Sequence, residues 1–533
     1  MNNDNNQRIF WGCFLALITT AFGFISRVFL INEWSTEFNL DPAQAGRLAG
    51  IGIWPFAVSI IAFSLFIDRI GYKVAMTISF LGYMIWSIMG VSAFFVSGGG
   101  EGNPDLGFKL LYWGSLILGL CNGTVEAYIN PIVATLFNKD KTKWLNILHA
   151  GWPGGLVLAG LVTIGLDHLE VAVPWWIKIG IIVPPAVVFF LMLLPVKFPV
   201  QERVASGVSY REMLAEFGVL GALVVGFLLT LQLMDFFSDG GANALTAAQK
   251  TTFIGIGVAI VAGFGLYTKS LGSPLLFVLA LIMTPLATTE IGTDSWITGI
   301  MEGVFSEIHP GWLLVYTSII MMILRFFAGS IVHKISPLGL LAVSCVFAIA
   351  GLFMLSKATG MAILGAATLY AFGKTFFWPT MLGIASEQTP KGGALTLNAL
   401  GGIGMLAVGT LGTTYIGTLQ ASKEIEVVTA NATIAAEVPA IFQDGELTVL
   451  EDKTVYEIIH YKTISEDRLS TALADLPSDK KAQVEESIQE VRAASKQGAL
   501  TNMCIFPASM LAGYALLGLY FKSRGGYQAE QLD

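Results

Sequence analysis

Charged residues are scarce in this sequence. Asp, Glu, Lys and Arg together make up 13% of its 533 residues, whereas a soluble protein carries about 25%. Hydrophobic residues make up 54% and gather in repeated runs of about 20 residues, long enough to cross the ~30 Å hydrocarbon core of a bilayer. These runs exclude a soluble globular fold and predict an all-α polytopic membrane protein held in the lipid bilayer.

Cysteine is also rare, and the patterns of known catalytic or cofactor sites are missing. The cysteines are Cys13, Cys121, Cys345 and Cys504. All four fall in apolar segments, where a disulfide framework is not expected, and their spacing is unlike that of a metal site. The glycine-rich stretches 392–393 and 401–404 lack the Lys-Ser/Thr ending of a phosphate-binding loop. We therefore expect no enzyme activity, no cofactor, no metal site and no nucleic-acid partner.

Fourteen apolar segments have the length of membrane spans. They are residues 8–32, 45–67, 74–96, 107–137, 143–166, 172–196, 216–236, 251–268, 273–300, 311–332, 338–356, 359–384, 394–419 and 501–521. Without the pair 216–236 and 251–268, twelve spans remain in the same orientation. No signal-peptide cleavage site follows the polar start Met1 to Gln7, so we expect the first apolar run to be retained as a span.

Lysine and arginine in short loops predict the orientation, because cytoplasmic loops are enriched in them. With the N-terminus in the cytoplasm, fourteen of these residues fall in cytoplasmic loops and only four in outer loops. The four outer residues are Arg47, Lys109, Lys250 and Lys357. We expect an integral protein of the cytoplasmic (inner) membrane with both termini in the cytoplasm.

Residues 420–500 differ from the rest of the chain. They hold fifteen acidic and eight basic residues, a net charge of −7, while the whole chain carries −8. Alternating patterns near 424–430 and 454–463 predict strands, and 478–494 reads as a helix. We expect a small extracytoplasmic α+β insert, either a solvated spacer or a surface that binds a ligand or partner.

The remaining boundaries follow from the spans. We expect an N-terminal six-helix bundle at 1–196, a cytoplasmic linker with two inserted helices at 197–272, the first five helices of a C-terminal bundle at 273–419, and the last helix with a cytoplasmic tail at 501–533. Within the linker, 210–217 has the pattern of an amphipathic helix at the membrane surface.

A motif recurs at the cytoplasmic ends of two spans. The sequence reads Ser64-Leu-Phe-Ile-Asp68-Arg69-Ile-Gly71-Tyr72-Lys73 after the second span and Gly329-Ser-Ile-Val-His333-Lys334 after the tenth. A small residue at its start lets two helices approach closely. The repeat resembles the signature of the major facilitator superfamily, with Ser64 in place of glycine and His333 in place of the acid. The resemblance implies two six-helix bundles and a conformational role for Asp68, Arg69, Gly71, Lys73, Gly329 and Lys334. We include Arg325, at the cytoplasmic end of its helix, in this conformational set, where its simplest role is structural.

A narrower resemblance concerns the fucose–proton symporter family, which consists of twelve-helix sugar–proton symporters. The segment Glu126-Ala-Tyr-Ile-Asn130-Pro131, followed by Leu145-Asn146, is similar to its fourth and fifth helices. The segments Trp378-Pro379-Thr380 and Arg325-Phe-Phe-Ala-Gly329 are similar to its second half. The family's first-helix aspartate, linked to proton coupling, would fall near Val28, where this sequence has Arg27 and no acid.

Charges in the middle of apolar spans are the strongest indication of function. Glu126 and Lys374 each lie five residues before a proline, and a charge near the bilayer midplane costs roughly 3 kcal/mol on insertion scales. Such residues face a cavity or a partner, and matching positions in two halves of a chain are typical of a transporter. By the resemblance, the first, fourth, seventh and tenth helices line the cavity. Here they carry Arg27, Glu126, Glu290, Asp294 and Lys374.

Glu126, Glu290 and His149 are the predicted proton-coupling residues. A carboxylate at low dielectric favours its neutral form and can exchange protons near neutral pH, although Glu126 could instead be a structural partner of Lys374 or Arg27. Glu290 shares a helix face with Asp294, so the pair could bind protons or Na⁺, or Asp294 could lie at the outer mouth. His149 could relay protons or simply pack.

The predicted substrate-binding residues combine cations, amides and an aromatic ring. They are Arg27, Lys374, Asn130, Asn398, Trp378 and Asp294. Arginine suits carboxylate or phosphate groups, and the amides could bind a polyol or hold helices together. The two cations could also merely balance Glu126 and Glu290. Asp235 receives no predicted role.

These features predict a secondary active transporter that works by alternating access. We expect proton-coupled uptake of a small polar solute, a sugar or sugar acid. The alternatives are a metabolite or drug exporter of the same fold, and a membrane sensor without transport that uses the 420–500 insert as its partner surface.

Overall fold

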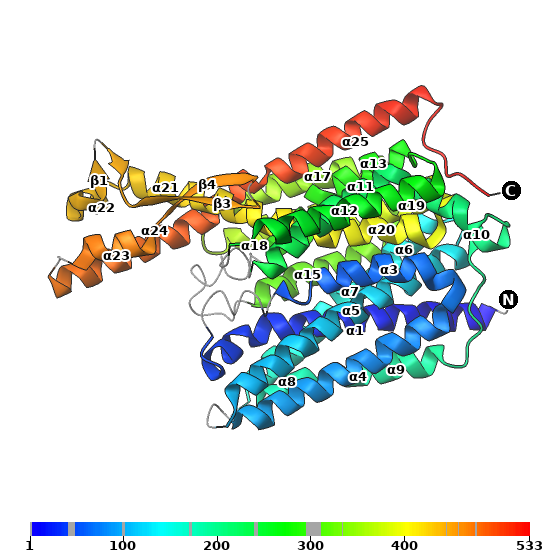
Figure 1. Cartoon of the computed structure of the whole chain (residues 1–533), viewed down its shortest axis with the longest axis horizontal. Helices are drawn as coiled ribbons and strands as arrows, with labels where there is room; N and C mark the ends of the chain where they lie inside the picture. The colour runs from blue at the N-terminus through cyan, green and yellow to red at the C-terminus, as the bar shows by residue number, and fades with distance from the viewer. Residues whose placement is uncertain are drawn as a thin grey trace.

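The structure is a computed structural model. It describes residues 3–40, 48, 50–98, 102–169, 173–238, 244–294, 311–332, 334–443, 445–456, 458–474 and 477–532. Its long helices run in one common direction and form an elongated bundle (Figure 1). The N- and C-terminal ends lie at one end of the bundle, which we call the inner end. A small unit of strands and helices projects from the opposite, outer end (Figure 1).

The helices of the N-terminal half pack around α5. They are α1 (Asn3–Glu37), α3 (Trp54–Ile70), α4 (Tyr72–Ser97), α5 (Pro104–Leu136), α6 (Lys141–His149), α7 (Gly151–Asp167), α8 (Trp175–Gly180) and α9 (Val183–Leu193). Along α5, every residue from Cys121 to Ala134 is buried. Helix α5 therefore carries Glu126 through the interior of the molecule and away from lipid.

The C-terminal half is built from helices that are more often interrupted. They are α13 (Pro274–Ala287) with the π-helical turn η2 (Thr288–Gly292), α15 (Gly311–Phe326), α16 (Ala328–Val332), α17 (Pro337–Leu355), α18 (Ala362–Lys374), α19 (Phe377–Gln388), η3 (Pro390–Gly392), α20 (Gly393–Ala407) with the π-helical turn η4 (Val408–Gly412), and α25 (Ile505–Ser523). The halves meet where α7 packs against α15 and α3 packs against α20.

Between the halves, the chain forms a short helix and two long ones. These are α10 (Glu202–Ala205), α11 (Tyr210–Phe237) and α12 (Ala247–Thr268). The predicted amphipathic helix 210–217 is the first part of α11, which bends at Gly218, where φ is 57°. The backbone beyond the bend is fixed by hydrogen bonds from Val219 N to Ser270 O (3.1 Å) and from Leu220 N to Leu271 O (2.9 Å).

In the described part of the chain, eleven helices are long and apolar enough to cross a membrane. Three of the predicted spans correspond to shorter helices: α3 with 17 residues, α15 with 16, and the broken pair α18 and α19 with 13 and 12. The polytopic all-α fold is confirmed, and the total of fourteen crossings stays a prediction.

The projecting unit is the expected small insert. Its elements are α21 (Thr413–Ala430), α22 (Ala432–Glu437), η5 (Pro439–Ile441), β1 (Phe442–Gln443), β2 (Glu446–Leu447), β3 (Leu450–Val455), β4 (Ile459–Ile464), α23 (Glu466–Ala474) and α24 (Ser478–Met503). Strands β3 and β4 form an antiparallel hairpin that pairs Leu450 with Ile464. The unit has a core of its own, separate from that of the bundle, with Ile434, Leu473 and Ile488 among its buried residues.

One prediction for the insert is wrong. Residues 424–430, predicted as a strand, form the last turns of α21. This helix continues directly from α20 and η4, so adding another turn requires no new helix nucleus. Its residue Val428 is buried in the insert core. The hairpin at 450–464 and the helix at 478–494 agree with the predicted strand and helix there.

Candidate functional site

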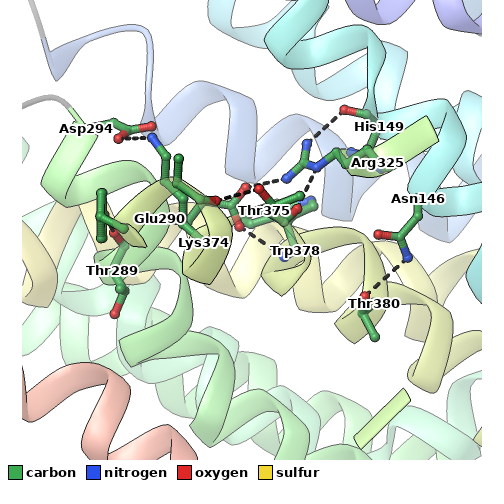
Figure 2. A network of polar contacts seen from close by, with 12 residues as sticks. Asn146, His149, Thr289, Glu290, Asp294, Arg325, Lys374, Thr375, Trp378 and Thr380 are labelled. Atoms are coloured by element: carbon green, nitrogen blue, oxygen red, sulfur yellow. Dashed lines mark hydrogen bonds and ion pairs between the residues drawn. The ribbon is translucent and has the colours of Figure 1, made fainter. Parts of the chain in front are cut away.

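A network of charged and polar side chains lies in the middle of the bundle, where helices of both halves meet (Figure 2). Two backbone irregularities shape it. The π-helical turn η2 carries Glu290, and such turns are frequent at functional sites. The second irregularity separates α18, which ends at Lys374, from α19, which begins at Phe377. This break leaves main-chain groups free to bind side chains.

Arg325 occupies the centre of this network. Its Nη2 donates to Glu290 Oε1 at 2.7 Å. Its Nε donates to the carbonyl of Thr375 in the helix break at 2.7 Å, and Nη1 donates to the carbonyl of His149 in the N-terminal half at 2.8 Å. One buried guanidinium thereby joins α15, the broken helix and α6 (Figure 2).

The carboxylate of Glu290 is held on both oxygens. Besides the bond to Arg325, its Oε2 accepts from the backbone N–H of Trp378 at 3.0 Å. Trp378 lies in the first turn of α19, where N–H groups have no intrahelical partner and favour an anion. Trp378 therefore contributes its backbone here, while its indole packs against Gly401 and Gly404 of α20.

Lys374 pairs with Asp294, the first acid after the π-helical turn. The lysine is fully buried, and its ammonium lies 5.3 Å from the ring centre of Tyr370. Sequence reasoning placed Asp294 at the outer mouth, or joined it with Glu290 in one ion site. In the structure the two acids face different cations, because the wider π-helical turn between them changes their relative direction.

Glu126 belongs to a second cluster, made mostly of amides. Asn130 Nδ2 donates to Glu126 Oε2 at 2.6 Å and also to Asn398 Oδ1 of the other half at 3.2 Å. His149 Nε2 lies 3.0 Å from Asn130 Oδ1 and 3.9 Å from Glu126 Oε2. In the described part of the chain, Glu126 has no ion pair with lysine or arginine, and the guanidinium of Arg325 acts on it only at longer range.

Asn398 links this cluster to the motif after the second span. Its Nδ2 donates to Ser64 Oγ at 2.9 Å and to the carbonyl of Ala127 at 3.0 Å. A parallel link is made by Asn146, whose Nδ2 donates to Thr380 Oγ1 across the halves at 3.2 Å (Figure 2). The network therefore spans α3, α5 and α6 on one side and α19 and α20 on the other.

Arg27 lies apart from these groups. Its Nη2 donates to the carbonyl of Leu48 at 3.2 Å, and its guanidinium fills the space above Gly52, where a Cβ would come within 1.6 Å of Nη1. Its described contacts are thus with residues of the N-terminal half that lie between α1 and α3. The sequence alternative in which Glu126 is paired with Lys374 or Arg27 does not agree with the structure.

Arg325 lies in the last turn of its helix, as the sequence predicts, but deeper in the bundle than expected. It is in the middle of the network, with 1% of its surface exposed. The reason is that α15 ends at Phe326 and a separate short helix, α16, continues toward the inner end. The helix end at Arg325 is therefore still inside the bundle.

The two copies of the repeated motif lie at the inner end. Asp68 pairs with Arg203 of the linker, Arg69 lies over the ring of Tyr210 at 4.1 Å, and Gly71 joins α3 to α4 with φ at 82°, which suits glycine. Lys73 is exposed.

In the second copy, a Cβ on Gly329 would come within 2.9 Å of Lys143 Cε, so this glycine permits close contact with α6. Lys334 is exposed, and His333 lies outside the described residues.

Glu387 connects the two halves and the C-terminal tail at the inner end, and it is not among the residues predicted from the sequence. It accepts from Thr142 N (3.0 Å) and Thr142 Oγ1 (2.5 Å) of the other half, and from Tyr527 Oη of the C-terminal tail (2.8 Å). The sequence did contain a signal for it, because Glu387 is an acid at a cytoplasmic helix end, where basic residues are more frequent. The predicted span stopped at residue 384, three positions earlier.

The described residues contain no group of three His, Cys, Asp or Glu side chains that could hold a metal ion. The network instead consists of ion pairs, amides and free main-chain groups. Its bonds join helices of the two halves, as those between Asn130 and Asn398 and between Arg325 and His149 show.

Comparisons with known proteins agree with this architecture. The model of the family described as the Major Facilitator Superfamily matches residues 12–413, and no curated protein matches the chain. A solved structure of the proton:xylose symporter XylE with bound 6-bromo-6-deoxy-D-glucose has a TM-score of 0.57 and 14% identity, covering 81% of this chain and 91% of its own. The fucose:proton symporter FucP of E. coli gives 0.50 and 13%, covering 94% and 98%.

A peptide transporter of the POT family, solved in an autoinhibited state, gives a TM-score of 0.57 and 13% identity, covering 99% of this chain and 98% of its own. Likeness at this level of identity concerns the fold. Because the family model covers more than half of the sequence and the fold agrees, the chain belongs to the major facilitator superfamily.

Proposed function

We propose that the protein is a secondary active transporter that couples the uptake of a small polar solute, a sugar or sugar acid, to protons. The observation that supports this proposal is a contrast among the three acids at the network, Glu126, Glu290 and Asp294. Glu290 and Asp294 each form an ion pair with a buried base. Glu126 is equally buried, but its nearest titratable neighbour is His149, at 3.9 Å.

Proton coupling follows from this contrast. An ionised carboxylate without a cationic partner is costly inside a membrane protein, so Glu126 must take up a proton before the site can close around it. Asn130 bonds both to Glu126 and to Asn398 of the other half. Protonation weakens the Asn130–Glu126 bond, since bonds to a charged acceptor are the stronger ones. The proton therefore alters a contact that joins the two halves.

The chemistry of the network favours a polar solute with hydroxyl groups. Asn130, Asn398 and Asn146 offer amides that can donate to or accept from a polyol. Lys374 offers a cation to an acidic group on the solute, which would have to compete with Asp294. Arg325 is held by one carboxylate and two carbonyls, so we assign it the role of ordering the site.

The test is uptake by the purified protein in proteoliposomes, with a panel of sugars, sugar acids and carboxylates, with and without a pH gradient. We expect one class to accumulate only when the gradient is present. Glu126→Gln should abolish accumulation but retain exchange of solute across the membrane, because the amide mimics the protonated acid. Asp105→Asn, on the exposed first turn of the same helix, is the matched control and should behave like the wild type.

Three results would contradict the proposal in different ways. Undiminished accumulation by the Glu126→Gln variant would remove this residue from coupling. Efflux driven by an inward proton gradient would indicate an exporter. Saturable binding of a solute without any flux would indicate a sensor.

A further inference from the structure

A large groove lies on the two inserted helices, α11 and α12, outside the network of charged and polar side chains. It has a volume of about 860 Å³ and is bounded by α11, α12 and the hairpin β3–β4 of the insert. Its walls are mainly aliphatic and aromatic, including Phe227, Ile254 and Val258. Val258 has 61% of its surface exposed, so the groove is open on the outside of the bundle.

The groove runs parallel to the helices. Along α11 it extends from Ser238 near the outer end to Leu223, fifteen residues or roughly 22 Å at the helical rise of about 1.5 Å per residue. One leaflet contributes about half of the ~30 Å hydrocarbon core. The groove is therefore long enough to reach from the headgroup region of one leaflet past the bilayer midplane.

The floor of the groove is formed by main chain. A Cβ on Gly226 would lie 3.0 Å from the carbonyl oxygen of Gly257, and a Cβ on Gly257 would lie 2.3 Å from Thr230 Oγ1. The two helices thus approach closely at these glycines, which line the groove without side chains of their own. A flexible, narrow apolar chain fits such a space better than a rigid helix with side chains.

The outer mouth of the groove is polar. Lys250 of α12 and Thr454 and Tyr456 of the hairpin line it. Tyr456 lies in the turn between β3 and β4, with φ at 54°, as hairpin turns often require. Its hydroxyl donates to Asp235 Oδ1 of α11 at 3.4 Å, so the hairpin is attached to the helix it covers.

We propose that this groove binds one anionic phospholipid from the leaflet on the side of the insert. One acyl chain lies between α11 and α12, and the phosphate lies at the mouth against Lys250, Thr454 and Tyr456. The ammonium of Lys250 supplies the preference for an anionic headgroup. The two hydroxyls line the mouth with their protein bonds in place, Tyr456 to Asp235 and Thr454 to His460. The hairpin gives the groove a cover at headgroup level, which an unspecific lipid-facing surface lacks.

The occupant would affect more than the inserted helices. α11 packs against α20, the helix that carries Asn398, and Tyr456 belongs to the insert. The lipid thus holds together the insert, the inserted helices and one wall of the site.

The experiment measures lipid binding directly and does not depend on transport. The full-length protein is reconstituted into nanodiscs of phosphatidylcholine with added phosphatidylglycerol. It is then released from the nanodiscs, and native mass spectrometry measures its mass together with any retained lipid. We expect one retained phosphatidylglycerol. Val258→Trp, which fills the groove, should reduce its retention at least tenfold. Leu266→Trp is the matched control, since Leu266 is 79% exposed on the same helix and does not line the groove.

A second pair of variants tests the headgroup. Lys250→Gln should lower the preference for phosphatidylglycerol over phosphatidylcholine several-fold, while Lys109→Gln, an exposed lysine at the outer end of α5, should not. Equal retention in Val258→Trp and Leu266→Trp would overturn the lipid site. Equal binding of both lipids by the wild type would overturn the anionic assignment. A dimer mass that Val258→Trp abolishes would show the groove to be an interface between two copies instead.

Discussion

Arg325 shows how a buried charge in this protein is made tolerable. Its three bonds reach two carbonyls and one carboxylate, so the guanidinium fork is used in three directions. Lysine presents a single point of charge and could not replace this geometry. The position of Arg325 thus depends on the helix break that exposes the carbonyl of Thr375 as much as on Glu290.

The Arg325–Glu290 pair gives a prediction for stability. Glu290→Gln leaves the arginine buried without its counter-charge and should cost about 3–5 kcal/mol, while the double variant Glu290→Gln, Arg325→Gln should cost clearly less than the sum of the single changes. Thermal unfolding in detergent measures all three. Combining Glu290→Gln with Lys178→Gln, whose partners are Glu33 and Asp167, serves as control and should be additive. Additive losses in the Arg325 cycle would contradict the pairing.

The sequence indicated which residues carry charge inside the bundle but not how they pair. Glu126, Glu290 and Lys374 stand out because a charge in an apolar span needs an explanation. Their partners depend on how each helix is rotated, which spacing alone does not determine. The π-helical turn before Asp294 changes that rotation. The five residues of the turn, Thr-Thr-Glu-Ile-Gly, contain no proline, and Pro285 of α13 does not by itself predict a π-helical turn.

At the scale of elements, the breaks were only partly predictable. Pro379 lacks an N–H and disfavours a continuous helix, which agrees with the interruption between α18 and α19. The bend in α11 at Gly218 was not predicted, because a glycine in an apolar segment is as often a packing site as a bend. The structure explains it through the backbone of residues 270–272, which lies against this point.

Gly218→Ala should therefore destabilise the base of the inserted helix pair. A side chain in the left-handed region costs roughly 1–2 kcal/mol, and the new Cβ would lie 2.2 Å from Gly272 N. We expect a lower unfolding temperature in detergent. Gly255→Ala, within α12 and with no atom within 4 Å of its new Cβ, should leave the temperature unchanged or raise it. Equal behaviour of the two variants would show that the bend is not required.

The C-terminal tail is the second element with a testable role. Tyr527 and the backbone of Glu530 both bond to Glu387, which also holds Thr142 of the other half. Since a hydrogen bond to a charged group contributes about 1.5–3 kcal/mol, Tyr527→Phe should open the inner end more often, by roughly tenfold in population.

A cysteine placed at Ala134, in the cavity behind this contact, reports the opening through its rate of maleimide labelling in a background without the four native cysteines. Tyr527→Phe should accelerate labelling, and Tyr520→Phe, on α25 beside Arg524, should not. Unchanged labelling in both variants would show that the tail packs against the inner end without controlling its opening.

At the scale of the whole molecule, the sequence predicted the membrane fold and the two halves correctly. Apolar runs of about twenty residues and a repeated motif can be recognised in a sequence without knowing which residues are in contact. The insert was predicted as a unit because its composition changes abruptly, yet its first strand is a helix. That error has a physical cause. Helix α21 continues from α20 and η4, and α24 leads into α25, so the first and last residues of the insert are helical because they continue helices of the bundle.

We expect the insert to be dispensable for solute binding. Its core is separate from that of the bundle, and Arg492 Nε lies 2.7 Å from Glu424 Oε1, so the bases of α21 and α24 are close enough for a short Gly/Ser linker in place of residues 431–490. Gln497, which donates to the carbonyls of Leu355 and Ala358, is retained. Solute affinity in proteoliposomes should stay within a few-fold of wild type. A large loss of affinity, at normal amounts of protein in the membrane, would instead give the insert a part in delivering the solute or in gating.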